Sequence, residues 1–460
     1  MAELAAEDGG EAMSPGASRE SLRQRVIRAG GWTIFGLAMN QVLRFGSNLI
    51  LTRLLFPEAF GLMALVQSVL AGVALLSDVG ISQSIVISAK GADQRYIHTA
   101  WTIQICKGAL IALVLLALAH PVAAYYKQPL LAQLLPMVAL VAFFDGFIST
   151  KVALSNRNVD AKRVTLIEVG ALFINIVVAT LLALRDPTPW ALAWGYMTGE
   201  LVKMLSSHLI LKGPRDRFAW DPAMARGIFS FGVWVMLSSS LTFLGGEGNR
   251  LIWGSVLDIR LLGLLGLATT INIVVWNLLK QVAGRVLLPA YSEVLRTSPE
   301  RFSRAVERAR FVQVAPAWCF AFLLAFGGPT LFHFLYDARY QQAGTIVQIL
   351  AMGLMVDMLN GSFAGVLWAM KRIGISTVMQ VALLACQIGG MLLGYWLHGK
   401  PGAIIGFAAA GWVLYPLHAT VYARLGLWHP RIDIPVLVAS TAVVITVALT
   451  NDWSALEAIK

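Results

Sequence analysis

Three polar side chains recur at helical spacing within the first long apolar stretch of the chain. Asn40, Arg44 and Asn48 are four residues apart, and Gln41 lies beside them. Residues at this spacing share one face of a helix, so they would form a polar stripe. The guanidinium of Arg44 carries a permanent charge and binds phosphate oxygens in pairs. The pattern indicates a site for a diphosphate or a similar anionic group.

A second polar set lies in a later apolar stretch, where Arg250 is the candidate cation. Its neighbours are Ser238, Ser239, Ser240, Thr242, Glu247 and Asn249. Two such helices would form the walls of one hydrated cavity. Acids within or at the ends of apolar stretches are candidates for coupling, gating or helix packing: Asp78, Asp145, Glu168, Glu200 and Asp357. Glu200 is in the middle of its stretch, where it is placed to carry a proton.

A purely structural role is the alternative for both arginines. A charged side chain at mid-membrane costs about 2.5–3.5 kcal/mol, so each needs a partner. Arg44 would then pair with Asp78 on the next stretch, and Arg250 would neutralise Glu247 one turn away. Pairing and substrate binding are compatible with each other.

The composition identifies the kind of protein that must position these residues. The chain has 460 residues, of which 57% are hydrophobic and 13% are charged. Soluble proteins have about 45–50% apolar and about 25% charged residues. So few charges cannot cover a soluble fold of this size, and so apolar a chain is not disordered. We therefore expect a polytopic membrane protein.

Thirteen apolar runs are long enough to cross about 30 Å of hydrocarbon as helices. Lipid requires every backbone group to find its hydrogen bond within the same helix, and the runs lack the alternation of a membrane β-barrel. We expect an all-α integral membrane fold of about 12–14 transmembrane helices. The runs lie at about 30–55, 60–86, 98–124, 129–151, 164–184, 188–211, 227–256, 260–289, 311–335, 342–370, 373–397, 402–424 and 433–450.

The distribution of Lys and Arg predicts the orientation. If the N-terminus is cytoplasmic, 24 of these residues, including Lys203 and Arg310, lie on the inner side and 7 on the outer side. Membrane proteins concentrate basic residues on the cytoplasmic side of their helices. The net charge of +11 then reflects membrane insertion, and no nucleic acid partner is implied. The cysteines and histidines show no ligand spacing, so neither a metal site nor a cofactor is expected.

An internal repeat predicts how the helices are organised. An offset of 202 residues places Trp32 on Trp234 and Gly61 on Gly263. A duplicated unit of six helices keeps its orientation in the membrane and gives two pseudo-symmetric lobes around a central cavity. The expected division is a cytoplasmic tail with a basic lead-in at 1–29, an N-lobe at 30–211, an inter-lobe linker at 212–226, a C-lobe at 227–425 and an additional helix at 426–460.

Several short motifs follow one another in a familiar order. Residues 51–62, LTRLLFPEAFGL, and residues 77–84, SDVGISQS, are followed by 249–252, NRLI, and 288–292, LPAYS. Their order resembles the bacterial polysaccharide transporter, or oligosaccharide flippase, family. That family belongs to the multidrug/oligosaccharidyl-lipid/polysaccharide (MOP) exporter superfamily, and the resemblance covers about residues 30–425. Asn249 and Arg250 replace an acid that is usual in the family's motif, and the thirteenth run departs from its usual 12 or 14 helices.

The resemblance implies a MATE-like fold and a bacterial inner-membrane location. It also implies movement of an undecaprenyl-diphosphate-linked oligosaccharide between leaflets by alternating access, for lipopolysaccharide O-antigen, capsule or exopolysaccharide synthesis. In that picture Arg44 and Arg250 contact the diphosphate, while Asn40, Gln41 and Asn48 face the sugars. Transport would be coupled to a proton or sodium gradient or to the membrane potential, and polysaccharide polymerase machinery is a candidate partner.

Two other functions fit parts of the sequence. A drug or cation antiporter of the same fold would need acids at mid-cavity. A membrane glycosyltransferase or polymerase would need substantial outer loops with catalytic acids or arginines, whereas the outer connections here are short. We therefore expect a transporter and not an enzyme.

Overall fold

The structure is a computed structural model that describes residues 22–158, 160–282 and 287–450. Within these residues the regular secondary structure is entirely helical, as the sequence predicts. The helices are α1 (Leu22–Leu54), α2 (Pro57–Leu76), α3 (Ile81–Ile87), α4 (Gln94–Tyr125), α5 (Leu131–Gly146), α6 (Lys151–Arg157), α7 (Ala161–Arg185), α8 (Pro189–Leu209), α9 (Pro222–Gly245), α10 (Glu247–Val256), α11 (Ile259–Val282), α12 (Leu288–Thr297), η2 (Pro299–Arg301), α13 (Phe302–Leu335), η3 (Ala338–Tyr340), α14 (Gln342–Gly361), α15 (Ala364–Ala369), α16 (Ile373–Arg424) and α17 (Pro430–Thr450).

Seven of the described helices are long and apolar enough to cross a membrane, and the α5–α6 pair, bent by 56°, makes an eighth. The remaining predicted runs are helical where the structure describes them, and the run 227–256 is divided between α9 and α10 at Gly246. Among them, α1 and α8 carry the polar residues that the sequence analysis singles out, which lowers their apolar content.

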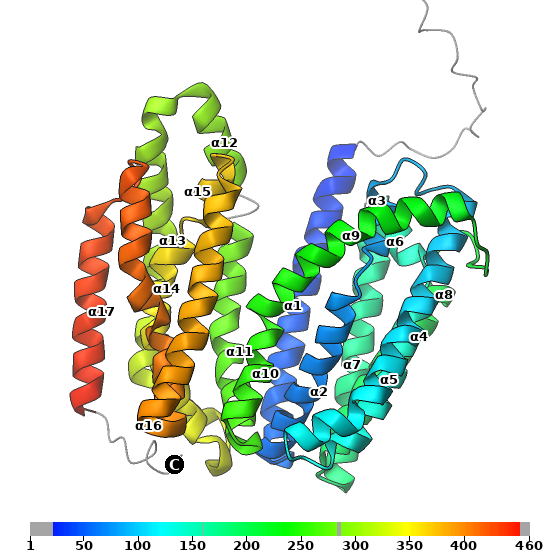
Figure 1. The fold of residues 1–460 in the computed structure, drawn as a ribbon, viewed down its shortest axis with the longest axis horizontal. Helices are drawn as coiled ribbons and strands as arrows, with labels where there is room; N and C mark the ends of the chain where they lie inside the picture. The colour runs from blue at the N-terminus through cyan, green and yellow to red at the C-terminus, as the bar shows by residue number, and fades with distance from the viewer. Residues whose placement is uncertain (1–21, 159, 283–286, 451–460) are drawn as a thin grey trace, which may run out of the picture.

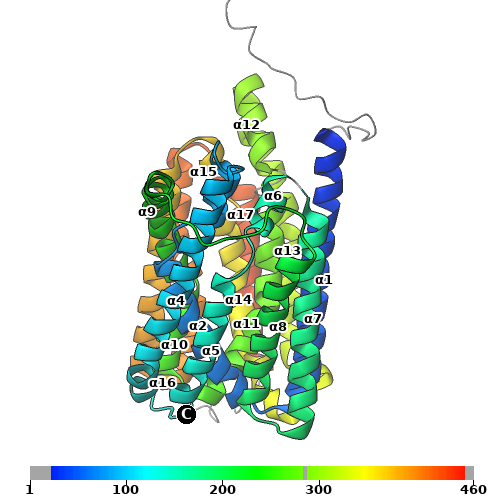
Figure 2. The ribbon, with the colours of Figure 1, turned by 90° about the vertical axis from the view of Figure 1, so that its right-hand side faces the viewer.

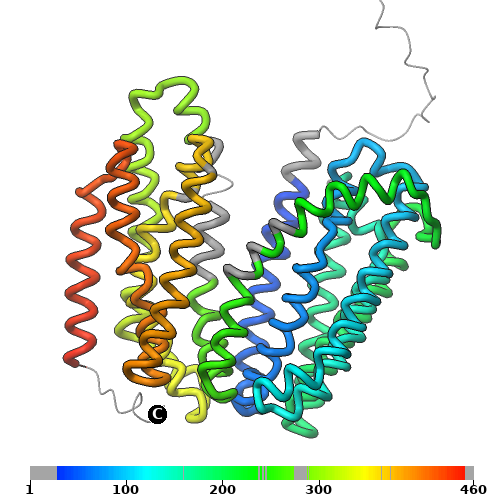
Figure 3. The backbone as a smooth tube through the Cα atoms, in the orientation of Figure 1, coloured from blue at the N-terminus to red at the C-terminus, as the bar shows by residue number. Residues whose placement is uncertain are grey.

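One long helix is a hairpin. α16 breaks at His398 and Gly399, where Gly399 has a φ of +64°. A Cβ at Gly394 would lie 2.0 Å from the carbonyl oxygen of Gly402, so the two halves pack closely after the turn. The chain reverses direction there (Figure 3). The predicted runs 373–397 and 402–424 are therefore separate helices.

The helices form two bundles that approach each other at one end and diverge at the other (Figure 1). We call α1–α8 the first bundle and α11–α17 the second. The start of α1 and the end of α17 lie at opposite ends of the molecule, and α12 projects beyond the other helices at the diverging end (Figure 2). A continuous apolar core links α2, α5, α11 and α14 through side chains such as Leu65, Val138, Leu264 and Ile346.

The bundles meet most closely where α2 crosses α11, at two glycines. A Cβ at Gly61 would lie 2.0 Å from the carbonyl oxygen of Ile259, and a Cβ at Gly263 would lie 2.0 Å from that of Pro57. The repeat offset of 202 residues relates Gly61 to Gly263 and Pro57 to Ile259, so the two contacts are equivalent. Such reciprocity is expected where two copies of one unit meet about a twofold axis. The domain boundaries given above stay a prediction.

A second contact at the same end joins the bundles near η3. The hydroxyl of Tyr340 donates to the carbonyl oxygen of Leu55 at 2.9 Å, and Arg339 donates to that of Arg53 at 2.9 Å. The Arg339 guanidinium also lies over the ring of Phe56. Hydrogen bonds from Arg339 hold the pKa of Asp337 below its ordinary value. Together these contacts hold the end of α1 against the second bundle.

Candidate functional site

Arg44 is exposed on α1, and among the described residues it has no ion-pair partner. It lies ten residues, or about 15 Å, before the end of the helix at Leu54. The other polar side chains of the stripe are less accessible to a ligand. The Asn40 amide donates to the carbonyl oxygen of Gly36 at 3.0 Å, and Asn48 and Gln41 are half-buried.

Asp78 has other partners than Arg44. Its carboxylate lies 3.1 Å from Lys107 Nζ on α4 and accepts from the hydroxyl of Ser239 on α9 at 3.1 Å. The backbone N–H of Gly80 also donates to it at 3.1 Å. The alternative in which Asp78 neutralises Arg44 is therefore wrong. Asp78 instead holds the end of α2 to α4 and α9.

Two of the predicted coupling acids meet around a lysine. Lys203 Nζ lies 3.0 Å from Glu200 on the same helix and 3.8 Å from Asp145 on α5. Glu168 on α7 also acts on Lys203 electrostatically. We call Asp145, Glu168, Glu200 and Lys203 the acid–lysine cluster. Arg44 lies on α1, which packs against α7, the helix that carries Glu168.

Lys203 is the member of this cluster that sequence reasoning missed. It was assigned to the cytoplasmic side because it is near the end of an apolar run. Its spacing of three residues from Glu200 on one helix is the signal that predicts an ion pair. With three acids around one lysine, the cluster has an excess of carboxylates and can exchange a proton or a cation.

Arg250 is paired. Its guanidinium lies 3.2 Å from Glu247 one turn earlier on α10. The hydroxyl of Ser68, which is buried on α2, donates to the same carboxylate at 3.0 Å. The structural alternative considered for Arg250 is therefore observed. The contact also joins α10 to the first bundle.

Asp357 lies in α14 of the second bundle, apart from the acid–lysine cluster (Figure 1). Its Oδ1 atom is buried and has no hydrogen-bond partner among the described residues. It faces the backbone of α16, since a Cβ at Gly411 would lie 1.9 Å from that oxygen. Asn360, one turn on, donates to the carbonyl oxygen of Gly411 at 3.2 Å.

A buried ion pair in the second bundle was not predicted. Arg310 on α13 and Asp433 on α17 are both 0% exposed and lie 2.7 Å apart. Ser362 accepts from the guanidinium at 3.0 Å, and Tyr415 donates to the carboxylate at 3.0 Å. The guanidinium also stacks over the ring of Phe363. Arg310, which was counted as a cytoplasmic surface charge, instead holds the thirteenth predicted helix in place.

The second bundle also contains an apolar pocket of about 1080 Å³. It is lined by α14, the hairpin turn of α16 and α17, including Met352, His398 and Trp412. None of the predicted site residues lines it. Among the residues that the structure describes, no group of three His, Cys, Asp or Glu side chains could hold a metal ion.

The comparisons with known proteins agree on a family. A family model described as polysaccharide biosynthesis protein matches residues 50–344. The lipopolysaccharide biosynthesis protein WzxC of Escherichia coli is 21% identical over 92% of this chain and 88% of its own length. The succinoglycan biosynthesis transport protein ExoT of Rhizobium meliloti is 22% identical over 71% of this chain and 66% of its own length.

Solved structures with this fold are transporters. The lipid II flippase MurJ, in an inward closed conformation, matches with a TM-score of 0.65 at 12% identity, covering 93% of each chain. An inward-facing MATE family multidrug resistance transporter matches with a TM-score of 0.64 at 15% identity, covering 90% of this chain and 99% of its own. At these identities the likeness shows the fold alone.

Proposed function

We propose that this chain, which belongs to the polysaccharide biosynthesis protein family, is a lipid-linked oligosaccharide flippase of the MOP exporter superfamily. Its substrate is an undecaprenyl-diphosphate-linked oligosaccharide destined for a surface polysaccharide, and it moves this lipid across the bacterial inner membrane by alternating access. The names of two relatives support this: WzxC is a lipopolysaccharide biosynthesis protein, and ExoT is a succinoglycan biosynthesis transport protein.

The observation that carries the proposal is the state of Arg44. A cation at bilayer depth is costly unless an anion or water stabilises it. Lys107 and Lys203 have carboxylate partners, whereas Arg44 is exposed and has none among the described residues. A diphosphate supplies the missing anion, and its oxygens match the fork of the guanidinium. Asn48 and Gln41, on the same helix, face the first sugars.

Arg250 has a smaller part in this proposal than the sequence suggests. Its charge is already neutralised by Glu247, so a substrate phosphate would have to compete with that carboxylate. We assign the diphosphate to Arg44 and keep Arg250 as a secondary contact. The Ser68–Glu247 hydrogen bond suits a role in holding α10 to the first bundle at this point.

We assign energy coupling to the acid–lysine cluster, which lies in the same bundle as Arg44. Protonation or cation binding at Glu200 or Asp145 would release Lys203 and change the charge within that bundle. Asp357 is a second coupling candidate in the other bundle. A drug or cation antiporter is the second candidate function, because the same acids would also attract a cationic substrate.

Genetic complementation tests the proposal. In a strain without this gene, the lipid-linked oligosaccharide should accumulate on the cytoplasmic leaflet while surface polymer is lost. Arg44→Ala should fail to restore the polymer at normal protein abundance, and Arg185→Ala, an exposed arginine at the end of α7, should restore it. Full export by Arg44→Ala would show that the diphosphate is bound elsewhere. Loss of the lipid-linked unit itself in the deletion strain would indicate an enzyme.

A further inference from the structure

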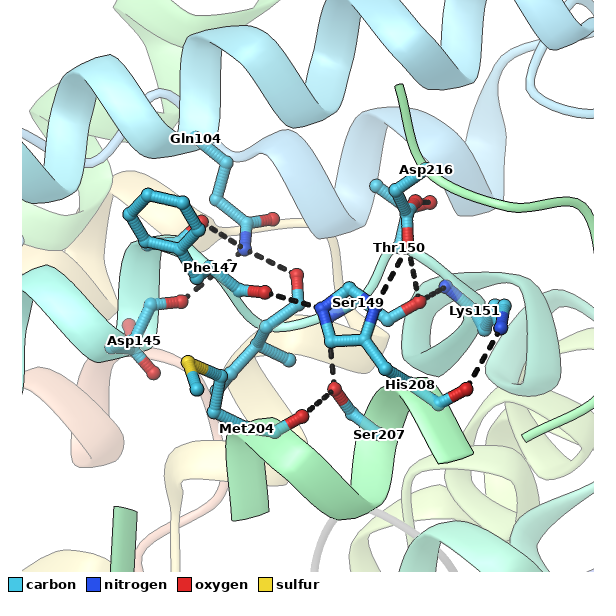
Figure 4. Close-up of polar contacts among 12 residues, drawn as sticks. Gln104, Asp145, Phe147, Ser149, Thr150, Lys151, Met204, Ser207, His208 and Asp216 are labelled. Atoms are coloured by element: carbon cyan, nitrogen blue, oxygen red, sulfur yellow. Dashed lines mark hydrogen bonds and ion pairs between the residues drawn. The ribbon is translucent and has the colours of Figure 1, made fainter. Parts of the chain in front are cut away.

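A buried carboxylate fastens the segment between α8 and α9 to the first bundle. We call residues 210–221 the linker; it contains most of the predicted inter-lobe connection. Asp216 in the linker is 1% exposed. The Ser149 hydroxyl donates to its Oδ2 atom at 2.5 Å, and the Thr150 hydroxyl donates to Oδ1 (Figure 4). Hydrogen bonds to an ionised group are stronger than neutral ones, so this is a firm attachment.

The hydroxyl donors to Asp216 belong to the bend between α5 and α6, which α4 and α8 hold in place. Gln104 on α4 donates to the last carbonyl oxygens of the bend, including that of Ile148 at 2.9 Å. His208 Nε2 on α8 lies 2.8 Å from the carbonyl oxygen of Phe147, and the N–H of Ser149 donates to the Ser207 hydroxyl at 2.9 Å. These bonds satisfy backbone groups that the bend would otherwise leave unpaired (Figure 4).

The attachment continues along the linker to the start of α9. The Thr102 hydroxyl donates to the carbonyl oxygen of Ala219 at 2.9 Å, and the N–H of Asp221 donates to the Thr99 hydroxyl at 3.1 Å. Asp221 then caps α9 by accepting from the N–H of Ala223 at 2.9 Å. Further on, Gly232 of α9 packs against Val79 of the first bundle. The linker and the first half of α9 thus contact the first bundle at several points along their length.

Helices next to the bend also carry members of the acid–lysine cluster. Asp145 precedes Ser149 by four residues, and Lys203 precedes Ser207 by four residues on α8. The helix α5, which leads into the bend, and α8 therefore each carry one partner of the Lys203–Asp145 ion pair, and α8 also carries Ser207 of the attachment.

We propose that Asp216 is a positioning residue that keeps the linker and the start of α9 fastened to the α5–α6 bend throughout the transport cycle. The linker then does not act as a free hinge. Movement of one bundle relative to the other takes place in the part of α9 that follows the linker. The part of this inference that concerns transport rests on the proposed function.

Hydrogen exchange tests the attachment without any substrate. Asp216→Ala removes both hydroxyl contacts, so the amides of residues 214–220 should exchange roughly 10–100-fold faster than in the wild type. Arg217→Ala, an exposed residue of the same linker, is the matched control and should leave exchange unchanged. If Asp216→Ala does not accumulate, Ser149→Ala with Thr150→Val removes the donors instead. Unchanged exchange in these variants would overturn the attachment.

A disulfide tests whether the attachment persists during transport. Ser149→Cys and Asp216→Cys are introduced after Cys106, Cys319 and Cys386 are replaced by Ala, and the protein is reconstituted in vesicles. The cross-linked protein should move lipid-linked oligosaccharide at least as fast as its reduced form. Loss of movement on cross-linking, restored by reductant, would show that the linker must detach. If wild-type protein moves no substrate, the proposed function fails, while hydrogen exchange still decides the attachment.

Discussion

Cationic side chains within a membrane protein require counter-charges. The cationic side chains of the first bundle differ in whether they have one. Lys107 pairs with Asp78, and Lys203 has three acids around it. Arg44 has none among the described residues. A lysine that is paired in the folded protein contributes to packing, whereas an unpaired arginine at bilayer depth must be compensated by water or by a ligand. This contrast is the reason for assigning the substrate to Arg44.

The buried pair of Arg310 and Asp433 supports a prediction about stability. Asp433→Ala leaves a fully buried guanidinium without its anion, which should cost about 3–5 kcal/mol. The thermal midpoint of the purified protein, followed by tryptophan fluorescence, should fall well below that of the wild type. Replacing both partners with apolar residues, as in Arg310→Met with Asp433→Leu, should recover most of the loss. Asp186→Ala, an exposed acid, is the control, and an unchanged midpoint for Asp433→Ala would refute this role.

Some of the charged residues discussed here could be identified from the sequence, whereas their partners could not. The stripe on α1 and the acids Glu200 and Asp145 were identifiable because a charge in an apolar run is unusual. The ion pairs of Lys203 and Arg310 were not predicted because both residues are near the ends of runs, where an exposed charge and a paired one look the same in the sequence. The partner of Asp78 was also wrong, since sequence spacing does not determine which neighbouring helix packs against it.

At the scale of helices, the α2–α11 crossing depends on glycine. A Cβ at Gly263 would collide with the carbonyl oxygen of Pro57, so backbones this close exclude any side chain. The repeat offset predicted that Gly61 and Gly263 are equivalent, but not that each packs against the start of the other's helix. That arrangement follows from how the bundles close, which the repeat alone does not specify.

Gly263→Ala should push α2 and α11 apart at this end. Spin labels at Glu58 and Arg260 should report a longer and broader distance distribution, and the thermal midpoint should fall. Gly266→Ala on the same helix is the matched control, because a Cβ there has nothing within 4 Å. If Gly263→Ala and Gly266→Ala gave the same distances as the wild type, the crossing would not depend on glycine.

At the scale of the molecule, the helical fold and the division of α16 into two helices were predictable from hydropathy and turn residues, whereas only seven or eight of the described helices pass as membrane spans against thirteen predicted runs. The predicted linker 212–226 overlaps the connection between α8 and α9, but its attachment through Asp216 was not predicted. A carboxylate in a polar, basic segment looks solvated in sequence, and only the fold brings the hydroxyls of Ser149 and Thr150 to it.

The orientation in the membrane remains a prediction, and thiol labelling tests it. In a variant without native cysteines, Glu300→Cys should react with a membrane-impermeant reagent only after the cells are opened. Asp186→Cys should react in intact cells, because it follows α7 at the opposite end. Both positions are exposed in the structure. The reverse pattern would place the N-terminus outside.

A direct measurement of translocation tests the claim that this protein moves a lipid-linked oligosaccharide with the help of Arg44. Purified protein is reconstituted in vesicles with undecaprenyl-diphosphate-linked oligosaccharide, and an enzyme that cannot cross the bilayer reports the sugar that reaches the other leaflet. Wild-type protein should move the lipid faster than protein-free vesicles, and Arg44→Ala should be roughly 10–100-fold slower, as expected when a charge-assisted contact of about 1.5–3 kcal/mol is lost. Movement by Arg44→Ala at the wild-type rate, or none by the wild type, would contradict the account.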